Sequence, residues 1–538
     1  GPFRGVTVGA FPIFAHLPEP VRRRNLPDLL RGHTGVSRFP LWETEAAGDA
    51  ATLFVHRAGP FAGSRWLCIG ADAACFASGS EATRALGEVV GLVGSALLVD
   101  GVRPQFRPGS DGMLMDVAVR AANLGPLSAT VPMRLTVDVG GKRRLDTPVD
   151  VRVDADPGVT LEKTAATGIR LDGADWLALD IRLEPAVTQR PVLGEQRFRF
   201  DARAALRTIC VYMLETAAAN QGKLHGYSFI DNRGMRALLG AYEVLGDERF
   251  LDAARQWGET MRREQRDDGG YRMGYGITRK GEECYVADGG EIAVGIARLV
   301  SYTEGAERQA ILHSLDAYMA YREDFRVPTG GIGVGWCLQD YGQRPTVPLD
   351  SPTRIYAAET NVYTIGCSLA AAYAHAALRG RADLFQRAAM DADWLAPRAP
   401  VLNGAFIESY VYAHAFAPNE ERRQVYADII RHAFVGKILD AGPRQYAWWL
   451  TGGGRTALNL AGIAYFLNRI EDTPDLRAEM LRAACLMFSP DVPESVLNVI
   501  ARGEMNHDTW IYLCYGTLGL VDVIRPVVSM ERFIPGAE

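Results

Sequence analysis

The sequence lacks the cysteine patterns that build metal sites or disulfide frameworks. Its eight cysteines are scattered, with no Cys-x-x-Cys pair and no paired-histidine spacing. An isolated cysteine behaves as a small apolar side chain, so we expect buried, reduced thiols. We expect no metal site, and no cofactor is indicated.

Long apolar runs and blocks of positive charge are also missing. The longest apolar stretches are interrupted by Gly, Ser or a charged residue before the roughly 20 residues that a membrane-spanning helix needs. The 58 basic and 64 acidic residues are well mixed, with a formal net charge of -6. We therefore expect no membrane span and no nucleic-acid partner. Residues 1–15 lack the order of a signal peptide, which leaves the localisation open, and the oligomeric state is not indicated.

From about residue 202 onward, nearly uncharged helices alternate with charged ones. The unit is clearest in 225–291, where SFIDNRGMRALLGAYEVLG precedes DERFLDAARQWGETMRREQR and a loop rich in Gly, Tyr and Arg. A helix that is apolar all round is buried, whereas a charged helix with one apolar stripe lies outside. The alternation predicts an (α/α)6 toroid over 202–538. The inner helices are expected at about 231–244, 289–303, 361–378, 405–416, 455–469 and 508–524, and the outer ones at about 202–219, 247–266, 306–323, 381–396, 419–436 and 473–488.

The first 201 residues have a different pattern. Between 99 and 201, apolar and polar residues alternate with a period of two, as in ATVPMRLTVDV, and Gly, Asn or Asp stand at the breaks. This pattern predicts an antiparallel β-sandwich, with a hairpin turn at 138–142. Residues 1–98 are expected to form a small α/β module, with a strand at Arg65–Gly70 and a helix at Ala82–Leu98.

The loops that precede the predicted inner helices are long and rich in aromatic and charged residues. All of them are expected at one end of the toroid, where a site would be built. The candidate catalytic residues are Asp231, Glu359, Glu408, Asp508, His225 and His507. The candidate substrate-binding residues are Tyr227, Arg233, Tyr271, Arg272, Tyr275, Trp336, Arg354, Tyr356, Tyr410, Trp448, Trp449 and Arg455.

The candidate carboxylates have different contexts. Glu408 lies within the apolar AFIESYVYAHAF, and a carboxyl buried there is expected to be paired or to have a raised pKa. Glu359 is similar, and one of these two is favoured as the catalytic acid. Asp231 and Asp508 stand at expected helix N-termini, where capping explains them as well as catalysis does. Asp288 and Glu291 match a capping box, and capping is the favoured interpretation of that pair.

The region from about 203 to 525 resembles the six-hairpin glycosidases and related (α/α)6 carbohydrate enzymes. The resemblance depends on the helical repeat, on DGGY at 268–271 and on GGIGVGW at 330–336. It implies a carbohydrate substrate, but it carries no catalytic residue over to this chain.

We therefore predict a glycoside hydrolase that uses two carboxylates. A polysaccharide lyase is the main alternative, with Tyr227, Tyr410, His225 or His507 as the base. An epimerase with two opposed histidines and a non-catalytic glycan-binding scaffold are further alternatives. Arginines in or beside the long loops, namely Arg233, Arg272, Arg354, Arg444 and Arg455, favour a substrate that contains an acidic sugar, unless they pair with carboxylates of the protein.

Overall fold

The computed structural model of the protein describes part of the chain, which forms two compact units, Gly1–Arg199 and Phe200–Glu538. The first unit contains strands and the second is mainly helical, so the fold mixes α and β elements. The predicted division into 1–98, 99–201 and 202–538 stays a prediction. The described residues are 36–44, 48–56, 65–69, 97–110, 112–123, 129–153, 160–171, 173–186, 196–274, 283–337, 353–355, 361–398, 404–435, 459–492 and 495–526.

The described strands of the first unit form three sheets, with the orders β1-β2-β3, β4-β5-β8 and β10-β9-β6-β7. Their bounds are β1 Val36–Thr44, β2 Gly48–His56, β3 Arg65–Ile69, β4 Leu97–Gly109, β5 Gly112–Asn123, β6 Ala129–Val139, β7 Lys142–Val153, β8 Thr160–Leu171, β9 Ala178–Pro185 and β10 Gln196–Asp201. Strand β4 contacts β9, and β5 and β8 contact β7. The β-sandwich itself stays a prediction.

The period-two pattern explains the strands. In β6, Met133, Leu135 and Val137 are fully buried, and these alternate with polar residues. The predicted hairpin joins β6 to β7 through Gly140 and Gly141, whose φ angles of 58° and 74° suit glycine.

The N-terminal predictions are only partly tested. The predicted strand at Arg65–Gly70 corresponds to β3. Most of the helix predicted at Ala82–Leu98 lies outside the described residues. For Leu97 and Leu98 it is wrong, because both pair with β5 as the first residues of β4.

The second unit contains the predicted helices in alternation. The inner helices are α5 Ser228–Leu245, α7 Val286–Leu299, α9 Asn361–Arg379, α11 Gly404–Ala415, α14 Leu460–Arg469 and α17 His507–Ile524. The outer helices are α4 Ala202–Ala219, α6 Glu248–Arg263, α8 Gly305–Asp324, α10 Ala382–Leu395, α12 Glu420–Ile429 and α15 Pro474–Phe488. Helix α12 continues as a π-helix, Ile430–Val435, and a short α16, Val496–Ala501, was not predicted. A small sheet is formed by β11 Cys284–Tyr285, β12 Gly335–Cys337 and β13 Thr353–Ile355.

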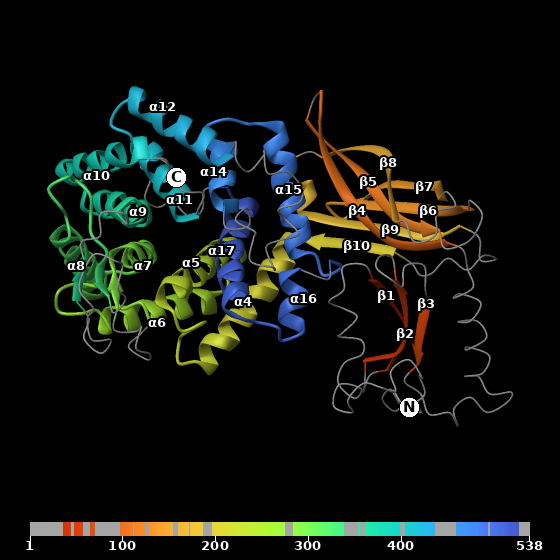
Figure 1. Ribbon diagram of the computed structural model, residues 1–538, viewed down its shortest axis with the longest axis horizontal. Helices are drawn as coiled ribbons and strands as arrows, with labels where there is room; N and C mark the ends of the chain where they lie inside the picture. Colours follow the sequence, from red (N-terminus) through yellow and green to blue (C-terminus); the bar gives the residue numbers. More distant parts are fainter. Residues whose placement is uncertain are drawn as a thin grey trace. The chain divides into compact units, whose positions relative to one another are not determined.

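The inner helices contact one another in a closed cycle. Helix α5 contacts α7, α7 contacts α9, α9 contacts α11, α11 contacts α14, α14 contacts α17, and α17 returns to α5. The cycle can be followed in Figure 1, from the yellow-green α5 to the blue α17. Glycines allow the close packing. A Cβ atom at Gly290 of α7 would meet the backbone of Ser368 in α9, and one at Gly240 of α5 would meet Val521 in α17.

The burial of α7 and α6 matches their predicted inner and outer places. Every residue of α7 is buried except Asp288, whereas α6 buries one stripe that includes Phe250, Ala254 and Trp257. The turn from α5 to α6 is short, and Gly246 supplies its left-handed residue at φ 71°. Two inner helices begin earlier than predicted, since α5 starts at Ser228 and α7 at Val286.

Candidate active site

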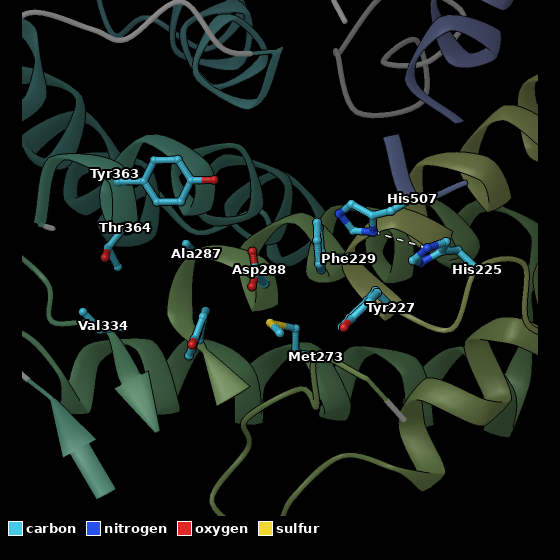
Figure 2. Close-up of a pocket in the computed structure, with 11 residues that line it drawn as sticks. His225, Tyr227, Phe229, Met273, Ala287, Asp288, Val334, Tyr363, Thr364 and His507 are labelled. Carbon is cyan, nitrogen blue, oxygen red and sulfur yellow. Dashed lines mark hydrogen bonds between the residues drawn. The ribbon is translucent and has the colours of Figure 1, made fainter. Parts of the chain in front are cut away.

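A cavity of about 700 Å³ lies at the N-terminal ends of four inner helices (Figure 2). Helices α5, α7, α9 and α17 all begin beside it, as the loop pattern predicted for one end of the helical unit. Its described lining consists of His225, Tyr227, Phe229, Met273, Tyr285, Ala287, Asp288, Val334, Tyr363, Thr364 and His507. Apolar and aromatic walls with a few polar groups are typical of a small-molecule site.

Two histidines form one wall of the cavity. His507 Nδ1 lies 3.3 Å from His225 Nε2, so one imidazole donates an N–H and the other accepts it. Tyr227 stacks on His225 with 5.2 Å between the ring centroids. Burial, and then the neighbouring His507, lower the pKa of His225, so His225 is neutral at pH 7. The wall therefore offers a neutral imidazole that can accept a proton.

Asp231 holds the histidine wall in place. Its carboxylate, inside the first turn of α5, accepts hydrogen bonds from the backbone N–H groups of Leu224 (3.0 Å) and His225 (2.8 Å). The N-cap residue of α5 is Tyr227, so Asp231 is not the N-cap that the sequence suggested. In this geometry Asp231 braces the loop that carries His225.

The other walls are tied together by backbone hydrogen bonds. Ser228 N–H and its hydroxyl both donate to the carbonyl oxygen of Met273 (2.7 Å each). Met273 N–H donates to Glu283 (2.9 Å), and Val286 N–H donates to Val334 (2.8 Å). The starts of α5 and α7 are therefore fixed relative to each other. Such a fixed frame preorganises the side chains that it carries.

Asp288 is the carboxyl group that opens into the cavity. It lies in the first turn of α7 and is half-buried, in a helix whose other residues are all buried. Burial, then the carboxylates of Glu291 and Glu283, raise the pKa of Asp288 to about 8. The positive end of the helix dipole favours an anion there, but burial and the two carboxylates outweigh it. Asp288 is therefore mostly protonated at neutral pH and can donate a proton.

The capping-box interpretation of Asp288 and Glu291 is wrong. The N-cap residue of α7 is Tyr285, and it makes no side-chain cap hydrogen bond. Because the helix starts before Asp288, both carboxyl groups lie inside it. Residues three apart in a helix share a face, so Glu291 follows Asp288 on the same side of α7.

Behind Asp288 lies a buried cluster that we call the Arg–Glu network, formed by Arg233, Arg236, Glu291 and Glu408. Arg233 contacts Glu291 (Nε to Oε2, 3.2 Å) and Glu408 (Nη1 to Oε2, 2.7 Å). Arg236 also pairs with Glu408. Tyr515 donates its hydroxyl to Glu291 (2.8 Å), and the Arg233 guanidinium lies 4.3 Å from the centre of the Tyr515 ring. Two cations thus balance two anions.

The network changes the expectation for Glu408. Burial alone would raise the pKa of Glu408, but Arg233 and Arg236 more than offset it and hold the pKa below the usual range. Glu408 is therefore ionised and paired, and the expectation of a raised pKa is wrong for this residue. Arg233 is occupied by the same network, which removes it from the arginines available to an acidic sugar. Its partners are Glu291 and Glu408, which the sequence did not pair with it.

Several predicted binding residues lie elsewhere in the fold. Tyr271 is buried, stacks on Tyr318 at 5.4 Å and bonds to Ser314 Oγ at 2.7 Å, which leaves no face for a sugar. Tyr410 is fully buried, with its ring centre 6.1 Å from that of Tyr426.

Two further predicted residues lie in the loop after α6 and in strand β12. Arg272 donates from Nε to the backbone oxygen of Glu264 (3.1 Å). The guanidinium of Arg266 lies 5.0 Å from the ring centre of Trp336. Neither Arg272 nor Trp336 is among the described lining residues.

The remaining predictions cannot be placed on the cavity. Residues Tyr275, Tyr356, Glu359, Arg444, Trp448, Trp449 and Arg455 lie outside the described residues. Arg354 lies in β13, where its backbone pairs with Trp336, and Asp508 lies in α17, but nothing is described of either side chain. The N-cap of α17 is Asn506, which forms a capping box with Thr509, so Asp508 is not the cap.

Of the predicted site residues, the cavity brings together His225, Tyr227 and His507. The sequence missed Asp288 as a site residue, although it carried a signal. In VADGGEIAVGIARL a mostly apolar helix has two carboxyl groups three residues apart, which is more than an N-cap requires. The lining residues Tyr363 and Thr364 of α9 had no comparable signal.

The part of the chain that the structure describes contains no group of three or more His, Cys, Asp or Glu side chains placed to hold a metal ion. Among the same residues, no helix combines the length and hydropathy of a membrane span. The cysteines with described side chains, Cys210, Cys284, Cys367, Cys485 and Cys514, are buried free thiols, as predicted for them.

No family model and no curated protein matches the chain. It is similar to a metagenome-derived glycoside hydrolase family 9 endoglucanase, at 12% identity and a TM-score of 0.40, over 71% of this chain and 82% of the other. A family 76 glycoside hydrolase from a bovine Bacteroides thetaiotaomicron strain matches at 9% identity and a TM-score of 0.28, over 72% of this chain and 98% of the other. A beta-1,2-glucanase from Parabacteroides distasonis matches at 10% identity and a TM-score of 0.34, over 82% of this chain and 71% of the other. Similar structures also include a polysaccharide lyase and an alpha-2-macroglobulin fragment from Escherichia coli. At TM-scores under 0.5, these similarities do not establish a shared activity.

Proposed function

We propose that the chain is a carbohydrate-active enzyme, a glycoside hydrolase built on an (α/α)6 toroid. The closed cycle of contacts among the inner helices supports the toroid. The observation that carries the function is a carboxyl group kept protonated in an aromatic-walled cavity at the N-terminal ends of those helices. Glycosidic bond cleavage needs such a group, because the leaving oxygen must receive a proton as its bond to carbon breaks.

Asp288 takes the role of general acid in this proposal. Its carboxyl donates a proton to the glycosidic oxygen, and the carboxylate that remains is less favourable in this site because Glu291 and Glu283 lie nearby. This electrostatic repulsion favours reprotonation of Asp288 from water after each turnover. A carboxyl with a pKa near the working pH is suited to this exchange.

A second group must act on water or on the sugar itself. Asp288 is the only carboxyl group in the described lining. We keep Asp508 and Glu359 as the candidates, since Asp508 directly follows the lining residue His507, and Glu359 shortly precedes Tyr363 in the sequence.

The substrate proposed is an oligosaccharide. The rings of Tyr227, Tyr285 and Tyr363 can stack on the C–H faces of a sugar, and the hydroxyl of Thr364 can bond to its O–H groups. No Lys or Arg is present among the described lining residues. An acidic sugar stays a proposal that depends on Arg354, and on Arg444 and Arg455 outside the described residues.

The test is a panel of neutral and uronate-containing oligosaccharides incubated with the purified protein. We expect new reducing ends from the wild-type protein and a large loss with Asp288→Asn, which keeps the side-chain volume and removes the acid. Full activity of this variant would refute Asp288 as the acid. Binding without turnover across the panel would favour a glycan-binding scaffold instead.

The contact between His225 and His507 favours a second candidate, a polysaccharide lyase. A neutral imidazole can remove the proton next to a uronate carboxyl group, and Asp288 can protonate the leaving oxygen. Elimination produces a conjugated double bond, which absorbs ultraviolet light, whereas hydrolysis does not. Rising absorbance during turnover, lost in His225→Gln, would support the lyase.

A further inference from the structure

Glu291 occupies a special position in the Arg–Glu network, because it also faces the cavity acid. It lies one helical turn after Asp288 on α7, so the two side chains share one face of that helix. Its carboxylate is fixed from two sides, by Arg233 (3.2 Å) and by the hydroxyl of Tyr515 (2.8 Å). Its side chain is only 5% exposed, so water screens its charge weakly.

The two carboxylates of the Arg–Glu network differ in their effect on Asp288. Arg233 and Arg236 supply two positive charges, and Glu291 and Glu408 supply two negative charges. Glu291 and Glu283 are the carboxylates that raise the pKa of Asp288, and Glu408 is not among them.

We propose that Glu291 is a positioning residue whose fixed negative charge keeps Asp288 protonated and so sets the alkaline limit of the reaction. This inference rests on the proposed role of Asp288 as the acid. Glu291 does not touch the substrate in this proposal, since it is absent from the described cavity lining. It acts through the field that it exerts on its neighbour in α7.

Other titratable groups face Asp288 from the elements packed around it. Electrostatic coupling to Asp288 also affects Tyr318 on α8 and Tyr363 and Cys367 on α9. His225 and His507 line the same cavity from α5 and α17, and Glu283 precedes β11. The tyrosines and the cysteine are neutral at the pH where Asp288 titrates, because the pKa of each is raised. Glu291 and Glu283 are the residues in this group whose charge raises the pKa of Asp288.

The experiment follows the proton of Asp288 directly, without any substrate. Infrared spectra over a range of pH detect the C=O stretch of a protonated carboxyl, and the difference between each protein and its Asp288→Asn version assigns that signal. We expect the midpoint for Asp288 to fall by about one pH unit or more in Glu291→Gln. The conservative Glu291→Asp should keep most of the wild-type midpoint, because it keeps the charge.

A matched control removes the other carboxylate of the same network. Glu408→Gln takes away one negative charge next to Arg233, but it should leave the Asp288 midpoint nearly unchanged. The double variant Arg233→Gln/Glu291→Gln guards against misfolding, because it removes one cation with one anion and leaves Arg236 paired with Glu408. It should lower the midpoint in the same direction as Glu291→Gln.

An unchanged midpoint in both Glu291→Gln and the double variant would overturn the inference, and so would an equal fall in Glu408→Gln. On an active substrate, the alkaline limb of the kcat/KM profile should move with the infrared midpoint. If the midpoint falls while Asp288→Asn keeps full activity, the role of Glu291 stands and the proposed function of Asp288 fails. The two claims are thus separable.

Discussion

Ionisable residues of the cavity wall and of the Arg–Glu network lie in or just before the inner helices, and their surroundings give them opposite charge states. In the cavity wall, Asp288 lies near two other carboxyl groups and His225 lies beside His507, with no opposite charge to favour ionisation among the causes of their pKa shifts, and both are mostly uncharged at neutral pH. In the Arg–Glu network, Glu408 is half-buried like Asp288 but remains ionised, because two guanidinium groups contact it. Burial alone therefore does not decide whether a carboxyl group holds its proton.

The comparison also distinguishes residues suited to catalysis from residues that stabilise the fold. A buried carboxylate in an ion pair is stabilised in its charged form, so it does not readily take up or release a proton near neutral pH. Breaking the pair leaves an uncompensated charge. An unpaired buried acid is costly to ionise, which makes it able to donate a proton. We therefore expect substitutions in the cavity wall to affect turnover and substitutions in the network to affect folding.

The largest effect is expected for Asp288→Asn. Loss of the proton donor should lower kcat/KM by about 10²–10⁴-fold, the usual contribution of a general acid. Steady-state kinetics on the oligosaccharide found active in the panel measure it. Glu420→Gln is the control, since the Glu420 side chain is 77% exposed on α12, and its kcat/KM should match that of the wild type.

Glu408→Ala should lower the stability of the fold, by breaking the Arg–Glu network, instead of acting on the catalytic step. It leaves Arg233 and Arg236 without their shared partner, and such losses cost about 3–5 kcal/mol of stability. Denaturant unfolding measures the change. The exposed pair of Arg423 and Glu420 gives the contrast, because Glu420→Ala should cost less than about 1 kcal/mol. Similar losses for both would show that the network is not a buried ion-pair cluster.

Asp288→Asn should also make the protein more stable, increasingly so as the pH rises from about 4 to about 8. The folded state holds the Asp288 proton up to about pH 8. The unfolded chain releases it near pH 4. In this window the unfolded state binds fewer protons, so wild-type stability falls with rising pH, by about 1.4 kcal/mol per pH unit at most.

The amide variant has no proton to lose and should not show that slope. Unfolding curves for both proteins at pH 5, 6, 7 and 8 compare them. A constant difference in stability across the series would mean that the pKa of Asp288 is not raised in the folded protein.

The smallest effect is expected at Tyr271, which the sequence placed in the binding site and the structure places in the core. Tyr271→Phe removes the hydrogen bond to Ser314 and should cost about 1 kcal/mol of stability. Its kcat/KM should not change, because the ring lies outside the described cavity lining. A marked rise in KM would restore Tyr271 as a binding residue.

Much of the secondary structure could be predicted from the sequence because its signals are local. The change from period two to helical period separates the strands from the helices, and charge separates α6 from α5 before any contact is known. Helix starts were less accurate. Ser228 and Val286 begin their helices without a side-chain cap, so the sequence pattern favours the nearest acidic residues, Asp231 and Asp288, as caps.

The sequence by itself determined the alternation of inner and outer helices and the end of the helical unit where polar loops gather. Only the tertiary structure decided which ionisable residue does what there. His225 and His507 are 282 residues apart in the chain, and Arg236 and Glu408 are 172 apart. The charge state of a buried group depends on the charges around it in space, and neighbours so distant in sequence leave no trace in the local pattern. Glu408 therefore looked like the acid, while Asp288 has the raised pKa.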